Sequence, residues 1–236
     1  GTHVAGLAAS AVTGVAPEAT IIPIKVMAAT GGGDLASILG GIYYAADLNA
    51  DFANMSLGMD SFGMTPAERL EVEGYFRQAL QYAAAKGTMV VAASGNGDPM
   101  TGSGFDIDKY PTYPASLIEV NSVAVASVDS NGALTSYSNF GSKSVLLAGP
   151  GGTEEKPVVA AYYQHQLAPY IGLQGTSMAT PVVVGTLAVL KSFKAGLTNE
   201  ATVRLLSLSS RKSTPLVGKV KSGGVVDLVA AMTAAG

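Results

Sequence analysis

The feature that most constrains this chain is a series of short, continuously apolar runs that alternate with helix-like segments. Runs rich in Val, Ile and Ala lie at residues 20–27, 52–57, 88–93, 120–126 and 144–148. Unbroken apolarity over such lengths is typical of strands that are covered on both faces, as in parallel sheets. We therefore expect these runs to form parallel strands of one buried sheet.

Capping signals mark helices between the runs. Asp34 stands before apolar residues at helical spacing and is a candidate N-cap. Thr65 and Glu68 have the spacing of a capping box with Pro66 at the first helical position, and Gly87 is a C-terminal stop. Helices are therefore expected at residues 34–48, 65–86 and 177–195, after Thr198 and after residue 224.

The order of these elements predicts the fold class. Strands and helices that follow one another in turn imply right-handed crossovers and a doubly wound sheet. We predict an α/β fold of three layers, with helices on both faces of a mostly parallel sheet and a site beyond the carboxyl ends of its strands. No internal repeat or linker interrupts the chain, so residues 1–236 are interpreted as one domain.

Composition excludes several classes of function. The formal charge of −3 and the lack of a Lys/Arg cluster argue against nucleic acid or an anionic membrane as partner. The apolar runs are shorter than the roughly 20 residues of a membrane span, and no secretory leader opens the sequence. The absence of cysteine excludes disulfides, zinc–thiolate sites and a thiol nucleophile.

The strongest chemical signal is Ser177, in the sequence Gly-Thr-Ser-Met-Ala-Thr-Pro at residues 175–181. A serine before a helix is often only its cap. A hydroxyl beside the free N–H groups of a helix N-terminus also suits a nucleophile whose attack creates an oxyanion. These seven residues resemble the nucleophile motif of the subtilisin-like serine proteases (subtilases, peptidase family S8), with Met and Pro in their expected places.

Two further motifs extend the resemblance. A serine nucleophile needs a base, and His3 lies in Gly-Thr-His-Val-Ala-Gly, which resembles the histidine motif of the family. The other histidine, His165, matches no motif and is interpreted as an ordinary polar side chain. Asn96 follows an apolar run in Gly-Asn-Gly, which in isolation is a turn. The resemblance implies that Asn96 is the side-chain donor of an oxyanion hole, together with the backbone N–H of Ser177.

The resemblance also implies where a substrate lies. Residues 31–33 and 54–58 would hold an extended peptide between them as an added strand. Residues 93–95 would form a wall of the pocket for the residue before the cleaved bond, and Thr112 would make its floor shallower than the glycine often found there. A cis bond before Pro114 is implied as well. The expected substrate-binding residues are Gly31, Gly32, Gly33, Ser56, Leu57, Gly58, Ala93, Ser94, Gly95 and Thr112.

The chain departs from the family pattern in two respects. The family carries an Asp before the histidine, but His3 is the third residue here and no Asp stands in an Asp-Ser/Thr-Gly context, so we assign no such Asp. We expect truncation to be the reason and the isolated chain to be nearly inactive. Residues 7–13 are too short for the calcium loop of many relatives, so no metal site is predicted there, and structural calcium elsewhere is left open.

We therefore predict a secreted serine endopeptidase that acts through an acyl-enzyme, with Ser177, His3 and Asn96 in the roles given above. It requires no cofactor for its chemistry, and its partners are polypeptide substrates and its own propeptide. The missing Asp keeps a second hypothesis open, a catalytically inactive subtilase-fold domain that binds peptides or acts as a scaffold. An α/β-hydrolase esterase is disfavoured, because Ser177 lacks the Gly-x-Ser-x-Gly elbow.

Overall fold

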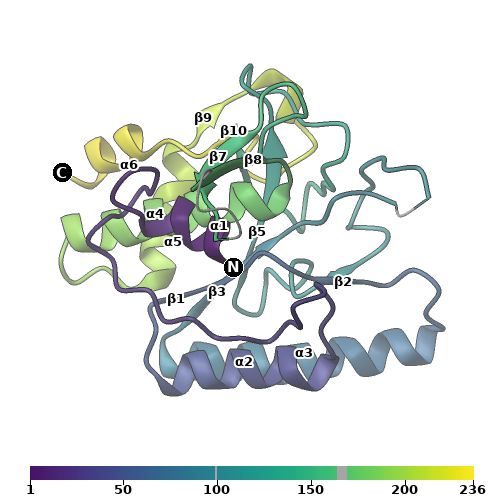
Figure 1. Ribbon diagram of the computed structural model, residues 1–236. Helices are drawn as coiled ribbons and strands as arrows, with labels where there is room; N and C mark the ends of the chain where they lie inside the picture. Colours follow the sequence, from purple (N-terminus) through teal and green to yellow (C-terminus); the bar gives the residue numbers. More distant parts are fainter. Residues whose placement is uncertain (99, 164–168) are drawn as a thin grey trace.

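The computed structural model describes residues 1–98, 100–163 and 169–236, so His165 lies outside the described residues (Figure 1). The helices are α1 (Thr2–Ala9), α2 (Leu35–Asp47), α3 (Pro66–Lys86), α4 (Thr176–Phe193), α5 (Asn199–Ser209) and α6 (Leu228–Ala235), with a 3-10 turn at Thr214–Leu216. The strands are β1 (Phe52–Met55), β2 (Met59–Asp60), β3 (Met89–Ala93), β4 (Thr112–Tyr113), β5 (Ser122–Val128), β6 (Leu147–Pro150), β7 (Val158–Ala161), β8 (Tyr170–Leu173), β9 (Arg211–Lys212) and β10 (Gly224–Val225).

A central sheet with the strand order β1-β3-β5-β6-β10-β9 organises the molecule. Its pairings are parallel except for that of β10 with β9, which is antiparallel. Four of the five apolar runs form β1, β3, β5 and β6, with ends shifted by a few residues. The predicted α/β class with a mostly parallel sheet is confirmed.

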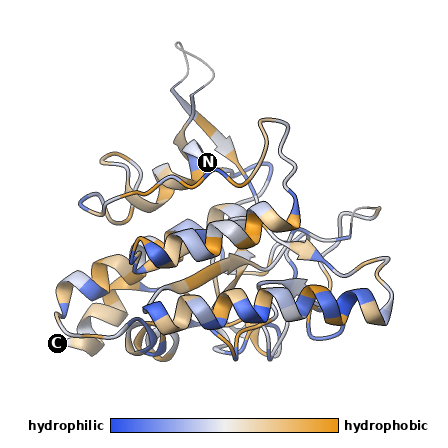
Figure 2. Ribbon diagram, turned by 90° about the horizontal axis from the view of Figure 1, so that it is seen from below, coloured by the Kyte–Doolittle hydropathy of each residue, from blue (hydrophilic) through white to orange (hydrophobic). Residues whose placement is uncertain are grey.

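Helices cover both faces of this sheet (Figure 1). Alternate strand residues point to opposite faces: Val91 and Val123 pack with α4, whereas their neighbours Ala92 and Ala124 pack with α2 and α3. In Figure 2 the strands behind the helices carry the hydrophobic colours. The continuous apolarity of the strands is thus explained, because neither face meets water.

The capping signals place the helices as expected. The Asp34 side chain accepts a hydrogen bond from the Ser37 amide at the start of α2, and Thr198 caps α5. Both bonds of the Thr65–Glu68 capping box are present at α3, which ends at Gly87 in the left-handed conformation at φ +82°. These local bonds satisfy helix-end groups that would otherwise lack partners.

The prediction of a strand at residues 20–27 is wrong. The segment is extended but belongs to no strand, and Ile21 and Ile22 remain 46% and 43% exposed. No strand among the described residues pairs with this run. Pro23 also lacks the amide hydrogen that a strand residue would donate.

Helix α1 and the pair of strands β7 and β8 were not expected from the sequence. Residues 2–9 form helix α1, and strands β7 and β8 form an antiparallel ribbon. Leu7 of α1, Ala160 of β7 and Met178 of α4 share one small apolar cluster. The helix that bears His3 is therefore packed between the ribbon and the start of α4.

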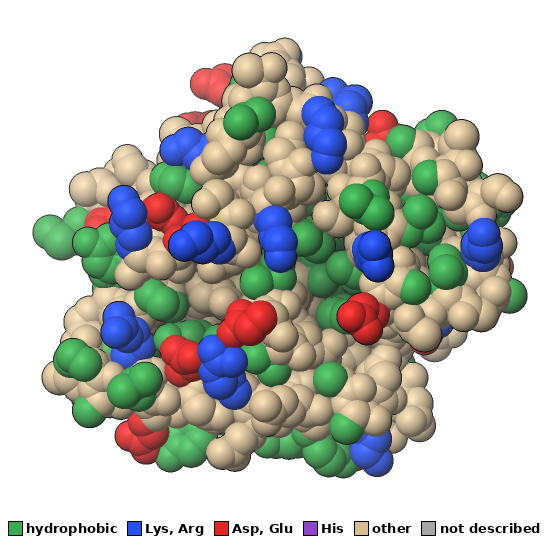
Figure 3. All heavy atoms as spheres, turned by 180° about the vertical axis from the view of Figure 1, so that it is seen from behind, with side chains coloured by type: hydrophobic (Ala, Val, Ile, Leu, Met, Phe, Trp, Pro, Cys, Tyr) green, Lys and Arg blue, Asp and Glu red, His purple; other side chains and the backbone are tan. Residues whose placement is uncertain are grey.

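The surface and the longest apolar helix bear on the excluded partners. Charges of both signs are interspersed on the face seen in Figure 3. Within the described residues one helix, α4, has the length and apolar composition of a membrane-crossing segment, but 56% of it is buried inside the fold. Its apolar character is accounted for by its place against the sheet, where Val183, Leu187 and Leu190 are fully buried.

Asp108 fixes the turn that leads into β6, and it provides a pH-dependent test of the fold. Its carboxylate accepts hydrogen bonds from the amides of Ser144 at 2.8 Å and Lys143 at 3.0 Å, and from the Ser142 hydroxyl at 3.3 Å. Partial burial raises the pKa of Asp108, but these hydrogen bonds outweigh it and the net pKa is lowered.

We expect Asp108→Asn to lower the free energy of unfolding by about 2 kcal/mol at pH 7, because hydrogen bonds to a charged carboxylate are replaced by weaker bonds to a neutral amide. A lowered folded-state pKa means that this stabilisation is present above the unfolded-state pKa of about 4 and is lost as the pH falls through the folded-state pKa. Urea unfolding of both proteins between pH 7 and pH 3 checks this. Glu154→Gln, at an exposed carboxylate, is the control, and a difference that stays constant over this range would contradict the assignment.

Candidate active site

The start of α4 lies at the carboxyl ends of two neighbouring parallel strands. Strand β1 pairs with β3 in the register Asn54↔Val91 and Met55↔Ala92, so the residues that follow each strand emerge at the same edge. Ser56 follows β1, and Asn96 stands three residues after β3. Ser177, the second residue of α4, contacts the first of these segments, and its neighbour Thr176 contacts the second.

Ser177 and Ser56 are joined by two reciprocal hydrogen bonds. The Ser177 hydroxyl donates to the Ser56 carbonyl at 3.1 Å, and the Ser56 hydroxyl donates to the Ser177 carbonyl at 2.8 Å. The second bond has a cause in the sequence. Pro181 stands four residues after Ser177 inside α4 and has no N–H, so the Ser177 carbonyl lacks its helical donor. Ser56 supplies the donor that Pro181 cannot.

Asn96 is held with its amide nitrogen directed away from its anchor. Its Oδ1 accepts from the Thr176 backbone N–H at 2.8 Å and from the Thr176 hydroxyl at 2.9 Å. Gly175, at φ +143°, brings the chain close: a Cβ built there would lie 3.4 Å from Asn96 Nδ2 and 3.6 Å from the Ser177 nitrogen. The two donors expected for an oxyanion hole, Asn96 Nδ2 and the Ser177 N–H, thus both lie near Gly175 at the start of α4.

His3 is not joined to Ser177 in the structure. Its side chain is 4% exposed, and Nε2 lies 3.1 Å from both the Val158 and the Ile171 carbonyl oxygens of the β7–β8 ribbon. Carbonyl oxygens only accept, so Nε2 carries the proton in this arrangement. The other ring nitrogen, Nδ1, is buried and has no hydrogen-bond partner among the described residues. The structure therefore anchors Asn96 to the residue before Ser177 but places the expected base on the ribbon.

The expected walls of the substrate pocket surround the same edge of the sheet. Ser94 is fully buried, and the Gly95 amide donates to the Thr176 hydroxyl at 3.3 Å. A Cβ on Gly58, just before β2, would lie 3.2 Å from the Thr112 side chain of β4, so these two residues are close neighbours. Leu57 packs against the apolar cluster beneath, and Ala93 ends β3.

Thr112 has two properties that matter for a pocket floor. It is 3% exposed, and its hydroxyl has no hydrogen-bond partner among the described residues.

The bond between Tyr113 and Pro114, next to Thr112, is cis, as the resemblance implied. Burial, followed by the nearby Glu73 carboxylate, raises the pKa of Tyr113 to about 12, so Tyr113 is a neutral hydrogen-bond donor to Glu73 at physiological pH.

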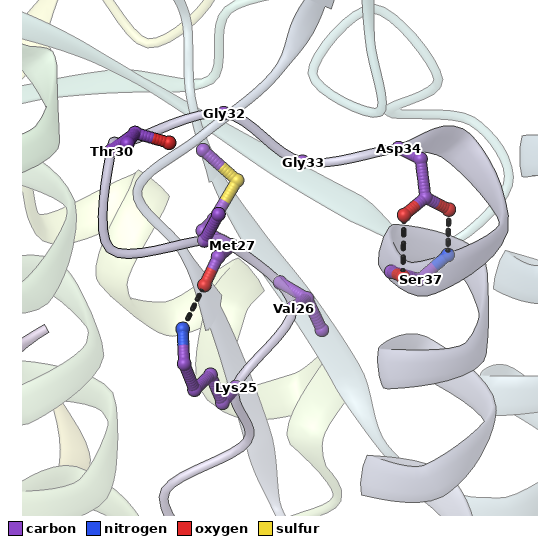
Figure 4. Close-up of a pocket in the computed structure, with 9 residues that line it drawn as sticks. Lys25, Val26, Met27, Thr30, Gly32, Gly33, Asp34 and Ser37 are labelled. Carbon is purple, nitrogen blue, oxygen red and sulfur yellow. Dashed lines mark hydrogen bonds between the residues drawn. The ribbon is translucent and has the colours of Figure 1, made fainter.

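Gly32 and Gly33, part of the other expected substrate segment, line an open hollow of about 550 Å³ (Figure 4). Gly31, at φ +90°, lies in the turn before them, whose Ala28 amide donates to the Gly32 carbonyl at 2.7 Å. A Cβ on Gly33 would lie 2.7 Å from the Met27 sulfur, so this position has no room for a side chain. The hollow opens beside the start of α2 and is not lined by Ser177 or Asn96.

No group of three or more His, Cys, Asp or Glu side chains that could hold a metal ion occurs within residues 1–98, 100–163 and 169–236. The polar groups at the start of α4 are hydroxyls, backbone amides and the Asn96 amide. Such a set suits the stabilisation of a developing oxyanion by hydrogen bonds.

Comparison with known proteins identifies the family. The sequence profile of the subtilase family, peptidase S8, matches residues 1–224. The chain belongs to the subtilase family. It is 36% identical over 198 residues to thermitase of Thermoactinomyces vulgaris and 36% identical over 196 residues to subtilisin Savinase of Lederbergia lenta.

These alignments cover 81% of the chain but only 61% of thermitase and 62% of Savinase, so this subtilase sequence spans less than two thirds of the curated relatives it matches. Among solved structures, a protease from Pseudoalteromonas arctica superposes with a TM-score of 0.78 at 31% identity, over 99% of this chain and 70% of the other. The leader-peptide-processing protease EpiP of Staphylococcus aureus, at 24% identity, shows the same fold with a TM-score of 0.83, over 99% of this chain and 62% of the other.

Two residues of this subtilase site were not singled out from the sequence as partners. The Thr176 hydroxyl forms hydrogen bonds with Asn96 and Gly95. Pro181 leaves the Ser177 carbonyl without a helical donor, and the Ser56 hydroxyl donates to it instead. Both lie inside the nucleophile motif, so the signal was present. Their roles depend on elements that are distant in sequence, which the motif does not name.

The pairing of Ser56 with the carbonyl left free by Pro181 can be tested by a double-mutant cycle. We expect Ser56→Ala to lower the free energy of unfolding by about 1–2 kcal/mol, because the Ser177 carbonyl loses the hydroxyl that donates to it. In a Pro181→Ala background the helix supplies an N–H, and the same substitution should cost less than half as much. Thermal unfolding of the four proteins measures this, and equal costs in both backgrounds would refute the pairing.

Proposed function

We propose that this chain is the catalytic part of a serine endopeptidase that cleaves extended polypeptides through an acyl-enzyme. Ser177 is the nucleophile, His3 the general acid and base, and Asn96 the oxyanion donor together with the Ser177 N–H. The observation that carries the proposal is that Asn96 is bonded to Thr176, the neighbour of Ser177, and that Asn96 Nδ2 and the Ser177 N–H both lie near Gly175 at the start of α4.

The chemistry follows from these positions. The Ser177 oxygen attacks the substrate carbonyl carbon while its proton passes to Nε2 of His3, and the carbonyl oxygen becomes an oxyanion between the two N–H donors. His3 then gives the proton to the departing amine as the C–N bond breaks. Water, deprotonated by His3, hydrolyses the acyl-enzyme and restores the Ser177 hydroxyl. To do this, His3 must leave the Val158 and Ile171 carbonyls and carry its ring proton on Nδ1, so that Nε2 is free to accept the proton of Ser177.

The unpaired Nδ1 of His3 supports a further part of the proposal. We assign its partner to a carboxylate supplied by the whole protein from outside these 236 residues, as the family resemblance implies. The contrary hypothesis is a non-catalytic peptide-binding domain. It draws on the other ring nitrogen of His3, because Nε2 lies against the β7–β8 ribbon and not against Ser177.

The remaining assignments follow the family. Polypeptides would lie along residues 31–33 and 54–58, with a side chain above Thr112, and the propeptide would occupy the same groove. We propose secretion and a single domain over residues 1–236. We also propose no calcium site in the loop after α1, since residues 7–17 contain no carboxylate to bind a hard cation.

The test is covalent labelling of the full-length product of the gene that encodes this chain. We expect a fluorophosphonate to modify Ser177, as located by mass spectrometry of the peptides. Ser177→Ala should abolish the adduct, and His3→Ala should slow labelling by roughly 1,000-fold, because the nucleophile loses its base. A folded parent protein without an adduct on Ser177 would refute catalysis and leave the peptide-binding hypothesis.

A further inference from the structure

A buried asparagine from another part of the chain holds the loop that carries Asn96. Asn139 is 2% exposed, lies in the segment before β6, and matches none of the motifs discussed above. Its Oδ1 accepts from the Gly97 amide at 3.0 Å and from the Phe105 amide at 3.1 Å. Its Nδ2 donates to the Ser94 carbonyl at 3.1 Å.

The main chain of Asn139 adds to these contacts. Its N–H donates to the Gly95 carbonyl at 3.0 Å, and its carbonyl accepts from the Ser94 hydroxyl at 2.9 Å. Asn139 therefore bonds to the residues immediately before and after Asn96. With acceptors facing its nitrogen and donors facing its oxygen, the orientation of its side-chain amide is fixed by the network.

The loop needs such an anchor because of its composition. Gly95 and Gly97 flank Asn96 and have φ values of +109° and +88°, a region that glycine enters freely in both the ordered and the disordered chain. Asn96 itself is exposed. Asn139 is also in close contact with Gly95, since a Cβ there would lie 2.3 Å from Asn139 Nδ2.

We propose that Asn139 is a positioning residue: by clamping residues 94–97 it directs the Asn96 amide toward the oxyanion, a role that rests on the function proposed above. An oxyanion donor is effective only within a few tenths of an ångström of its position. Thr176 holds the Asn96 side chain, and Asn139 holds the backbone before and after Asn96. The two clamps together leave Nδ2 of Asn96 free to donate to the substrate.

The kinetic test is a double-mutant cycle in the full protein, with a peptide p-nitroanilide as substrate. We expect Asn139→Ala to lower kcat roughly tenfold or more with KM changed less than about twofold, because the oxyanion forms only in the transition state. Asn96→Ala should lower kcat by roughly 100-fold or more, the range known for such a donor in a subtilisin. In the Asn96→Ala background, Asn139→Ala should then change kcat less than about twofold.

A matched control separates positioning from a general loss of stability. Asn121 likewise bridges backbone carbonyls, of Thr88 at 2.7 Å and Leu80 at 3.3 Å, but at the opposite end of β3. Asn121→Ala should lower the melting temperature and leave kcat within about twofold of the parent. A loss of kcat for Asn139→Ala that persists undiminished when Asn96 is absent, or that matches the loss for Asn121→Ala, would overturn the proposal.

A second measurement does not depend on turnover. The Thr176 amide donates to Asn96 Oδ1, and the structure shows no hydrogen bond between Thr176 and Asn139. In Asn139→Ala, native-state exchange of the Thr176 and Gly97 amides should accelerate roughly tenfold. If the alanine variant does not fold, Asn139→Asp keeps the acceptor for Gly97 but loses the donor to the Ser94 carbonyl, and exchange of the Thr176 amide should still accelerate. Unchanged exchange would overturn the proposal. If exchange accelerates in the variant while the parent protein does not label at Ser177, the positioning role of Asn139 is supported and only the proposed function is refuted.

Discussion

The parallel pairing of β1 with β3 is the constraint on which the rest of the site depends. It brings the ends of two strands to one edge, where the chain must leave the sheet and its backbone groups lose their ladder partners. Ser56 and Asn96 lie in the two segments that leave this edge, and the first turn of α4 lies against both. The bonds of Ser56 to Ser177 and of Asn96 to Thr176 are therefore a consequence of sheet register.

The first turn of α4 then supplies the groups that bond to Ser56 and Asn96. A helix start has free N–H groups, and Pro181, one turn later, also leaves the Ser177 carbonyl without its helical donor. The Asn96 oxygen takes up the Thr176 N–H and the Ser56 hydroxyl takes up the Ser177 carbonyl, so both partners come from outside the helix. The Ser177 N–H, by contrast, has no hydrogen-bond partner shown within the described part of the chain, which leaves it available to an incoming oxygen.

Local rules were enough to predict much of this architecture from the sequence. The capping box at Thr65 and the apolar run of β3 act over a few residues, and both appear where expected. The prediction of a strand at residues 20–27 failed because a strand needs a neighbouring strand, and composition does not show whether there is one. The contact of His3 with the β7–β8 ribbon and the clamp by Asn139 each join segments more than 40 residues apart, so the motifs could name His3 and Asn96 but not their partners.

The state of His3 links the packing of α1 to the protonation of its ring. With Nε2–H directed at two carbonyls, Nδ1 is the unprotonated nitrogen, and a buried acceptor without a partner costs roughly 1–3 kcal/mol. A carboxylate next to Nδ1 would require the proton on Nδ1 and would remove this cost. Nε2 would then be an acceptor, which cannot bond to the Val158 or Ile171 carbonyl and is repelled by both. The group that orients the ring would therefore also release Nε2 from the ribbon and make it the base that the Ser177 hydroxyl needs.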